Sequence, residues 1–277
     1  MQFRDFHVHL EEGPFTIEWI KRFIEMGERR GITEIGFSEH GHRFKEAVGL
    51  MASDGFRGRW TKGEATEGIE DYIRVVEKAK GLGLAVKLGI ELDYIPKYED
   101  DIRKFVKSYP FDYVLGSVHW LKDFGFDHPA LIHEWEGLDV DKTYDEYFDT
   151  LLLAVRSGIF DVVAHPDVIK VFGHRARKDM SLRYDELAKA IYDMDLCAEV
   201  STAGLRKPVG ELYPSALLMK YFKKHDVPVM INSDAHVPED VGRDFDEALD
   251  FIKGFGYDKV CYFDKRDRKP MCIADHD

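Results

Sequence analysis

Short apolar or β-branched runs alternate with longer amphipathic stretches along all 277 residues of the chain. Runs of the first kind are typical of buried strands, and apolar residues spaced three and four apart are typical of helices packed on a sheet. Regular alternation of the two predicts βα units and a parallel sheet. We expect strands at residues 5–8, 34–38, 85–90, 112–118, 160–164, 196–200 and 228–232, with a further candidate at 259–263. We expect helices at residues 17–30, 68–80, 98–108, 144–157, 182–194, 214–224 and 244–253.

The number of these units favours one barrel over two domains. Seven or eight strands, each followed by a helix, fit a single parallel (β/α) barrel in a chain of this length. No Ser/Gly-rich joint divides the sequence, so we expect one domain over residues 1–277. Residues 45–67 contain several glycines and few periodic apolar residues, which predicts an excursion near the barrel mouth. Such a loop either covers a site or is a plain surface feature.

The chain is acidic, with 39 Lys and Arg against 52 Asp and Glu and a formal net charge of −13. This charge disfavours nucleic acid or an anionic membrane surface as a stable partner. The three cysteines form no Cys-x-x-Cys pair, which argues against a disulfide framework or a cysteine zinc site. Without a signal-peptide pattern or a membrane-spanning apolar run, we expect a cytoplasmic, unanchored protein.

Histidine is abundant for an acidic chain, with 12 residues, and half of them follow predicted strands. The carboxyl ends of parallel strands meet at one mouth of a barrel, where barrel enzymes place their chemistry. Imidazole and carboxylate groups are the usual ligands of zinc, manganese and iron, and six imidazoles favour two or three ions over one. The candidates after the strands are His7, His9, Glu11, His40, Glu91, His119, His165, Asp234 and His236.

Each of these motifs alone is a weak indication, because a single His-x-His pair is more often structural than metal-binding. Their joint placement after six different strands is what indicates a metal centre. We expect most of the other histidines on the surface or behind the ligands, with His42 and His174 able to reach the mouth. These other histidines are His42, His128, His133, His174, His225 and His276.

Six segments, in this order, resemble the PHP (polymerase and histidinol phosphatase) superfamily of metal-dependent phosphoesterases. They are His7-Val-His9, Ser38-Glu39-His40, Gly89-Ile90-Glu91, Gly116-Ser117-Val118-His119, Ala164-His165-Pro166-Asp167 and Ser233-Asp234-Ala235-His236. They span nearly the whole chain, and the sequence is most similar to the histidinol-phosphate phosphatase branch. The resemblance implies a distorted, TIM-like (β/α)7 barrel of the PHP type with three divalent metal ions, zinc, manganese or iron.

The resemblance also implies which residues bind each ion. The three ligand sets are His7, His9, Glu91 and Asp234; Glu91, His119 and His165; and His40 and His236. Glu91 would bridge the first two ions. Members of the family usually have one further ligand several residues after the first pair, but the residue at that spacing here is Phe15. Glu11 or Glu12 must serve instead, and we prefer Glu11 because it shares a face with the two histidines.

The activity that the resemblance implies is hydrolysis of L-histidinol phosphate to L-histidinol and phosphate, a step of histidine biosynthesis. A metal-bound hydroxide would attack phosphorus at neutral pH, so no protein nucleophile is needed. We name Glu91, Asp234 and His236 as the catalytic residues. His236 or a metal-bound water would give the departing alkoxide its proton. The metal charges would let an acidic chain accept an anionic substrate.

A phosphatase also needs groups that bind the two ends of its substrate. Arg206 is our first choice for the phosphate, because it follows the one strand without a ligand candidate and Arg binds phosphate with two parallel hydrogen bonds. Further candidates for phosphate are Lys170, Arg43, His42 and His174. Candidates to pair with the amine of histidinol are Glu199, Glu39 and Asp167.

Three alternatives remain open from the sequence. The same centre could act on another small phosphomonoester or a nucleotide. A metal-dependent amidohydrolase or deaminase also begins with His-x-His, but a lysine candidate at a middle strand end is missing. The barrel could also be a non-catalytic, metal-binding regulatory protein. The expected partner is a small phosphorylated substrate, and the sequence predicts no oligomeric state.

Overall fold

The computed structural model describes residues 3–273, and its centre is a seven-stranded parallel sheet in the order β1-β2-β3-β4-β7-β8-β9. Every neighbouring pair in this sheet is parallel. The strands are β1 (Phe3–Val8), β2 (Ile32–Phe37), β3 (Val86–Asp93), β4 (Tyr113–Ser117), β7 (Val162–Val163), β8 (Cys197–Ser201) and β9 (Val229–Asn232). The seven strands predicted from the sequence are confirmed, and the fold is the expected distorted (β/α)7 barrel.

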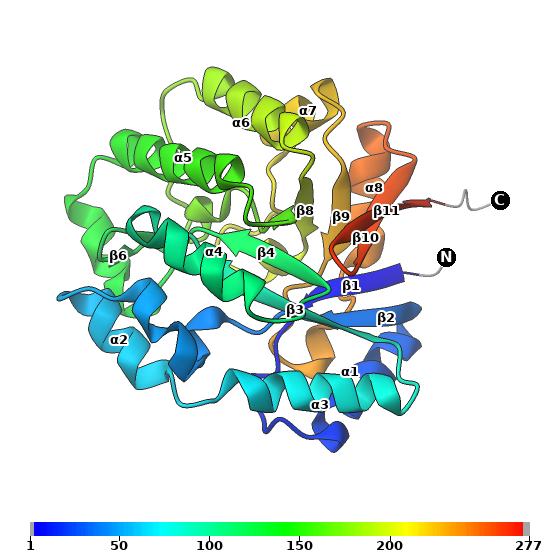
Figure 1. Cartoon of the computed structure of the whole chain (residues 1–277). Coiled ribbons are helices and arrows are strands. Elements are labelled where there is room, and N and C mark those ends of the chain that lie inside the picture. The colour runs from blue at the N-terminus through cyan, green and yellow to red at the C-terminus, as the bar shows by residue number, and fades with distance from the viewer. Residues whose placement is uncertain (1–2, 274–277) are drawn as a thin grey trace.

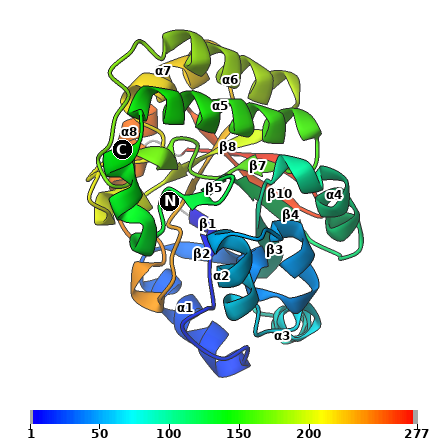
Figure 2. The same cartoon turned by 90° about the vertical axis from the view of Figure 1, so that its left-hand side faces the viewer.

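The sheet curves until its first and last strands approach each other. Ala235, just beyond β9, forms a parallel bridge with Val8 of β1. Two backbone hydrogen bonds join the same segments: His9 N donates to Ala235 O at 2.7 Å, and Ala235 N donates to His7 O at 3.1 Å. The carboxyl ends of all seven strands therefore surround one opening, which faces the viewer in Figure 2.

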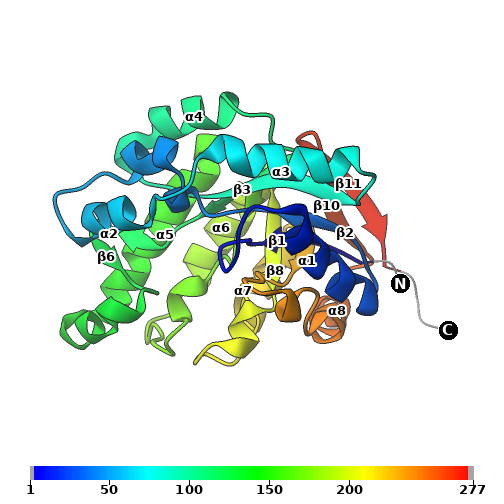
Figure 3. The same ribbon diagram turned by 90° about the horizontal axis from the view of Figure 1, so that it is seen from below.

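The helices pack around the strands, as Figures 1 and 3 show from two sides. They are α1 (Ile17–Arg29), α3 (Ile69–Gly81), α4 (Glu99–Lys107), α5 (Val140–Ser157), α6 (Ser181–Asp193), α7 (Ala216–Lys224) and α8 (Phe245–Gly254). Helix α1 is typical: the Thr16 side chain accepts a hydrogen bond from Trp19 N at its start, and Ile20 and Phe23 are buried. Gly31 follows its end at a φ of 75°, a conformation that favours glycine.

Short 3-10 segments lie in the connections. They are η1 (Gly41–Arg43), η2 (Lys45–Met51), η3 (Pro96–Tyr98), η4 (Pro129–Gly137), η5 (Val168–Lys170), η6 (Ala203–Arg206) and η7 (Pro238–Asp240). Five of them (η1, η3, η5, η6 and η7) come soon after barrel strands, so the chain turns tightly where it leaves the sheet. This keeps the residues that follow each strand close to the mouth.

The candidate strand at 259–263 is not part of the barrel. It forms β10 (Lys259–Asp264), which pairs antiparallel with β11 (Asp267–Cys272) in a separate hairpin. Phe263 of this hairpin packs with Phe6, Tyr113 and other residues of a small apolar cluster. The hairpin lies at the opposite end from α2 and β6 in Figure 1. It therefore adds apolar contacts at the end of the barrel away from the mouth.

The predicted excursion at 45–67 contains η2 and a helix that the sequence did not indicate, α2 (Phe56–Glu64). It packs near a small hairpin of β5 (Trp120–Leu121) and β6 (Phe124–Gly125). Arg57 joins the two: its buried guanidinium donates to the carbonyls of Met51 at 3.1 Å, Ala52 at 3.2 Å and Lys122. Trp60 and Glu64 of α2 line the cavity at the mouth.

Over residues 3–273, every helix is either too short or too polar to cross a lipid bilayer.

One fold prediction concerns the ring of Tyr113, which fills the barrel interior. A Cβ added to Gly89 would lie 2.2 Å from Tyr113 Cζ. Gly89→Ala should therefore lower the free energy of unfolding by about 1–3 kcal/mol, the usual result of overpacking a core. Urea unfolding followed by circular dichroism measures this change. Gly81→Ala is the matched control, since a Cβ there meets nothing within 4 Å; equal stability of the two variants would contradict this account of the interior.

Candidate metal centre

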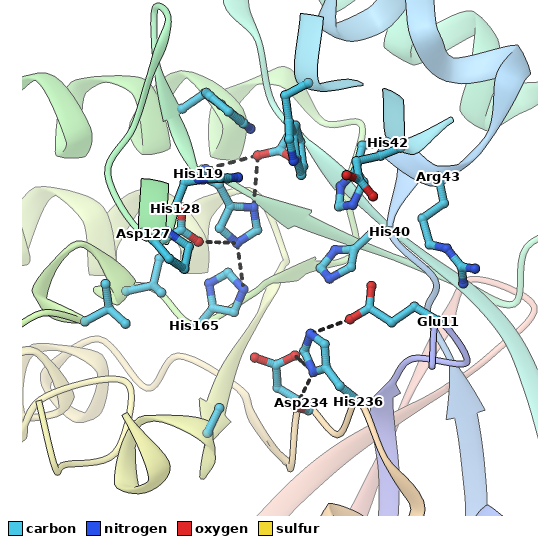
Figure 4. Close-up of a pocket in the computed structure, with 18 of the residues that line it drawn as sticks. Glu11, His40, His42, Arg43, His119, Asp127, His128, His165, Asp234 and His236 are labelled. Atoms are coloured by element: carbon cyan, nitrogen blue, oxygen red, sulfur yellow. Dashed lines mark hydrogen bonds and ion pairs between the residues drawn. The ribbon is translucent and has the colours of Figure 1, made fainter. Parts of the chain in front are cut away.

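The barrel brings all nine predicted ligand candidates to its mouth. His7 and Glu91 lie within β1 and β3, and the others lie on the segments that follow the strands. Four overlapping groups have ligand atoms that all lie within 4.8 Å of one another. These groups are His9, His40 and His236; His7, His9 and Glu91; His7, His165 and Asp234; and Glu91, His119 and His165. The overlap makes one continuous cluster, part of which is drawn in Figure 4.

Glu91 is the centre of this cluster. Its carboxylate is 1% exposed and lies 2.8 Å from His40 Nδ1, 3.0 Å from His165 Nε2 and 3.3 Å from His7 Nε2. Burial by itself raises the pKa of Glu91, but the charges of His40 and His7 outweigh it and leave this pKa well below its usual range. Glu91 is therefore a charged carboxylate, and each of its two oxygens can bind a cation.

Acidic residues behind the cluster orient its imidazoles. Glu199 accepts a hydrogen bond from His7 Nδ1 at 2.7 Å, and Asp93 accepts one from His119 Nδ1 at 3.0 Å. Each bond fixes the tautomer that points the Nε2 lone pair at the centre, the usual arrangement around a bound metal. Glu39 lies 3.5 Å from His9 Nδ1 and has a similar position.

Unpartnered buried atoms test whether the site fits metal ions. His7 Nε2 and Glu91 Oε2 are buried and have no hydrogen-bond partner among residues 3–273, although they lie 3.3 Å apart. Once His7 Nε2 has lost its proton, both atoms are electron-pair donors in the tautomer set by Glu199. Two such atoms repel each other unless a metal ion replaces that proton between them. The donor set and its geometry therefore fit metal ions.

The backbone at two candidate ligands is unusual. His165 has a φ of 25° and Asp234 a φ of 51°, both in the left-handed region that non-glycine residues seldom adopt. Asp234 is oriented by its neighbours: its Oδ1 lies 3.2 Å from His9 Nε2 and 3.5 Å from His7 Nε2. Strain of this kind is concentrated at sites where the chain aims a side chain for function.

His9 and His236 have pKa values shifted in opposite directions. Burial alone lowers the pKa of His9, but hydrogen bonds from this ring to Asp234 and Glu39 outweigh it and raise the value to about 9. Burial and the neighbouring His9 lower the pKa of His236 to about 4, against the opposing charges of Asp234 and Glu11. A metal binding at His9 must therefore displace a proton from its ring.

The sequence left open whether Glu11 or Glu12 is the further ligand after the first histidine pair. Glu11 Oε1 lies 3.2 Å from His236 Nε2 and faces the cluster in Figure 4. Glu12 also lines the cavity, but it is exposed. The geometry therefore favours Glu11 as the further ligand.

Two of the predicted phosphate-binding residues reach the mouth. Arg43 and His42 line a cavity of about 650 Å³ over the cluster. Arg43 forms an ion pair with buried Glu39. His42 lies between His40 and Trp60, with ring centroids 4.7 Å and 4.5 Å away.

The structure does not bring the other three to the cavity. Arg206 donates a hydrogen bond to the backbone carbonyl of Ser233 at 2.6 Å, so its guanidinium holds the segment that follows β9. Lys170 is 2% exposed and is paired with Asp167 and Glu211. His174 stacks on Trp135 with ring centroids 4.5 Å apart. Nearby acids, carbonyls or rings satisfy each of these side chains away from the cavity, so a role for them in phosphate binding stays a prediction.

The three candidate partners for the substrate amine do not line the cavity. Glu199 and Glu39 are fully buried and lie behind His7 and His9, and Asp167 pairs with Lys170. The cavity has other residues that the sequence did not single out for it: Trp60, Asp93, Trp120, Asp127, His128, Lys207 and Tyr213. Most of these come from loops, where no periodic pattern reveals the direction of a side chain. His276 lies outside the described residues.

Comparison with known proteins shows which family this chain resembles. A model of the PHP domain family matches residues 5–203. A probable histidinol-phosphatase of Deinococcus radiodurans is 35% identical over 193 residues, 69% of this chain and 74% of that protein. The histidinol-phosphatase of Bacillus subtilis is 25% identical, over 90% of this chain and 99% of its own.

A solved structure shares the fold. It is a histidinol phosphate phosphatase from Lactococcus lactis subsp. lactis, complexed with zinc, L-histidinol and phosphate. It superposes with a TM-score of 0.75 at 18% identity and covers 97% of this chain and 99% of its own. The family match over most of the chain and the 35% identical relative settle the classification. This chain belongs to the PHP domain family.

Proposed function

We propose that the protein is a metal-dependent phosphomonoesterase that hydrolyses L-histidinol phosphate to L-histidinol and phosphate. The observation that carries this proposal is the cluster of overlapping His/carboxylate groups around Glu91 at the floor of an open cavity. Relatives named histidinol-phosphatase or probable histidinol-phosphatase align with 90% of the chain in one case and 69% in another. The chemistry of the site supports hydrolysis of a phosphoester, and the names of the relatives support histidinol phosphate as the substrate.

We assign three ions to the cluster. Glu91 would bind two of them, one together with His7, His9 and Asp234 and the other together with His119 and His165. His40, His236 and Glu11 would bind the third, near His9. When bound, such ions act as Lewis acids on phosphate oxygens and lower the pKa of water enough for it to attack at neutral pH.

The residues of the chain supply orientation and charge around this centre. Glu199 and Asp93 keep the His7 and His119 rings in one tautomer, so their lone pairs remain available. Among residues 3–273, Arg43 and Lys207 are the Arg and Lys side chains that line the cavity, and we assign to them the phosphate oxygens that face solvent. The local positive charges make an anionic substrate compatible with a chain of net charge −13.

The first test is turnover. The purified protein, loaded with Zn²⁺, Mn²⁺ or Fe²⁺, should release phosphate from L-histidinol phosphate, and a chelator should abolish the release. A malachite-green assay with elemental analysis measures both. A panel of sugar phosphates and mononucleotides is the comparison; turnover of the panel without turnover of histidinol phosphate would leave a phosphatase with another substrate. No turnover of any ester by metal-loaded protein would favour a non-catalytic role.

The second test removes the central carboxylate. Glu91→Gln should lose at least one bound ion and lower kcat by at least about 100-fold, because an amide is a poor metal ligand and bears no charge. Metal content per chain and kcat measure the two effects. Glu77→Gln, at an exposed surface position, should change neither. Full metal content and full activity in Glu91→Gln would refute the cluster.

The third test addresses the acid behind His7. Glu199 accepts hydrogen bonds from His7 Nδ1, His165 N at 2.7 Å and Asn232 Nδ2 at 2.8 Å. The amide of Glu199→Gln must place its NH₂ group against one of these donors. We expect a 10–100-fold loss of metal affinity, as is common for such supporting residues, measured by competition with a chromogenic chelator. Unchanged affinity would show that the His7 tautomer does not depend on Glu199.

A further inference from the structure

One carboxylate in the cavity, that of Asp127, has a distant histidine as its only basic partner among residues 3–273. Asp127 follows β6, lines the cavity, and its side chain is 28% exposed. Its Oδ2 lies 4.0 Å from His119 Nε2, and it faces His119 and His165 in Figure 4. Among residues 3–273, no Lys or Arg pairs with it. It is therefore an acid at the edge of the candidate metal centre with room for a cation from outside.

The other carboxylates of the cavity are less suited to an outside cation. Asp93 accepts hydrogen bonds from the backbone N and from Nδ1 of His119, both at 3.0 Å. Glu11 pairs with His236, and Asp234 pairs with His9. Glu12 and Glu64 are exposed at the rim, where water screens their charge. Asp127 alone among these acids is partly shielded, near the centre and without a strong partner.

Aromatic rings line the same side of the cavity. Trp60 of α2 lies 5.2 Å from Trp120 of β5 and 5.4 Å from His128, measured between ring centroids. All three line the cavity. A flat heteroaromatic group can stack against such a surface, and a nearby cation gains from the ring faces.

We propose that Asp127 binds the ammonium group of the substrate and that the surface of Trp60, Trp120 and His128 receives its imidazole. The inference rests on the proposed function and assigns the part of the substrate that the metals do not touch. In L-histidinol phosphate the amino group and the ester oxygen are on neighbouring carbons. A phosphate at the metal cluster therefore places the ammonium group near the cluster edge, where Asp127 lies.

This assignment makes Asp127 a specificity residue. Arg43 lies on the other side of His40 from Asp127 in Figure 4, so the anionic and cationic ends of the substrate have separate binding groups. A partly buried carboxylate that has lost its cationic partner disfavours binding of any substrate without the amine. The enzyme should select amine-bearing phosphomonoesters for this reason.

The test compares two substrates that differ only in the amine: L-histidinol phosphate and imidazolylpropyl phosphate. In the wild type, kcat/KM should be about 100-fold higher for the amine-bearing ester. Asp127→Asn should lose most of that factor on L-histidinol phosphate and change kcat/KM of the other ester by less than about threefold. Metal content and melting temperature should stay at the wild-type values. Glu134→Gln, an exposed carboxylate nearby, is the matched control and should keep the preference.

Two outcomes would overturn the inference. An equal loss on both substrates together with loss of metal would make Asp127 a ligand of the centre, and an unchanged preference would show that the amine is bound elsewhere. The proposed function fails separately, if the wild type hydrolyses other esters but not histidinol phosphate. In that case O-phosphoethanolamine and ethyl phosphate, which also differ in an amine, replace the first pair, and the ratio of their kcat/KM values is measured. A preference for the amine-bearing ester that Asp127→Asn removes supports the inference, and the absence of any preference in the wild type refutes it.

Discussion

The burial of one carboxylate, that of Glu91, is the constraint on which the mouth of the barrel depends. A buried anion is costly unless opposite charges or hydrogen bonds surround it. The sheet fixes its position, since Glu91 N donates to Glu39 O at 3.1 Å and His40 forms a parallel bridge with it. Imidazoles from the ends of other strands then meet around it. The closure of the barrel therefore also brings the candidate ligands together.

The parts of this arrangement that the sequence predicted are those governed by periodicity. Seven strands and seven helices follow from alternating apolar patterns, and Thr16 and Gly31 mark the ends of α1 in both sequence and structure. The strand ends could then be identified, and with them the histidines that converge at the mouth. A parallel barrel makes this step reliable, because all its strands end on the same side.

The residues proposed to bind the substrate could not be predicted in the same way. Lys170 follows a strand just as His165 does, but Asp167 and Glu211 draw it into the interior. Asp167, three residues before Lys170, could have indicated this ion pair, because a tight turn brings side chains three residues apart together. Helix α2 was also missed: with Gly58 and Gly63 it has little amphipathic pattern, and the hydrogen bonds of Arg57 hold its start to the neighbouring loop.

The candidate metal ligands and the residues that line the rest of the cavity therefore come from different parts of the chain. The candidate ligands are at strand ends, where the sheet limits their movement. The residues that face the rest of the cavity, such as Arg43, Trp60 and Asp127, come from connecting segments. Loops tolerate substitution and insertion far better than strands that share a core. Changes in the α2 segment or the β5–β6 hairpin can therefore alter which phosphoester fits while the candidate ligands around Glu91 stay in place. Because the charges that meet the substrate are local to this cavity, the net charge of the whole chain says little about the substrate.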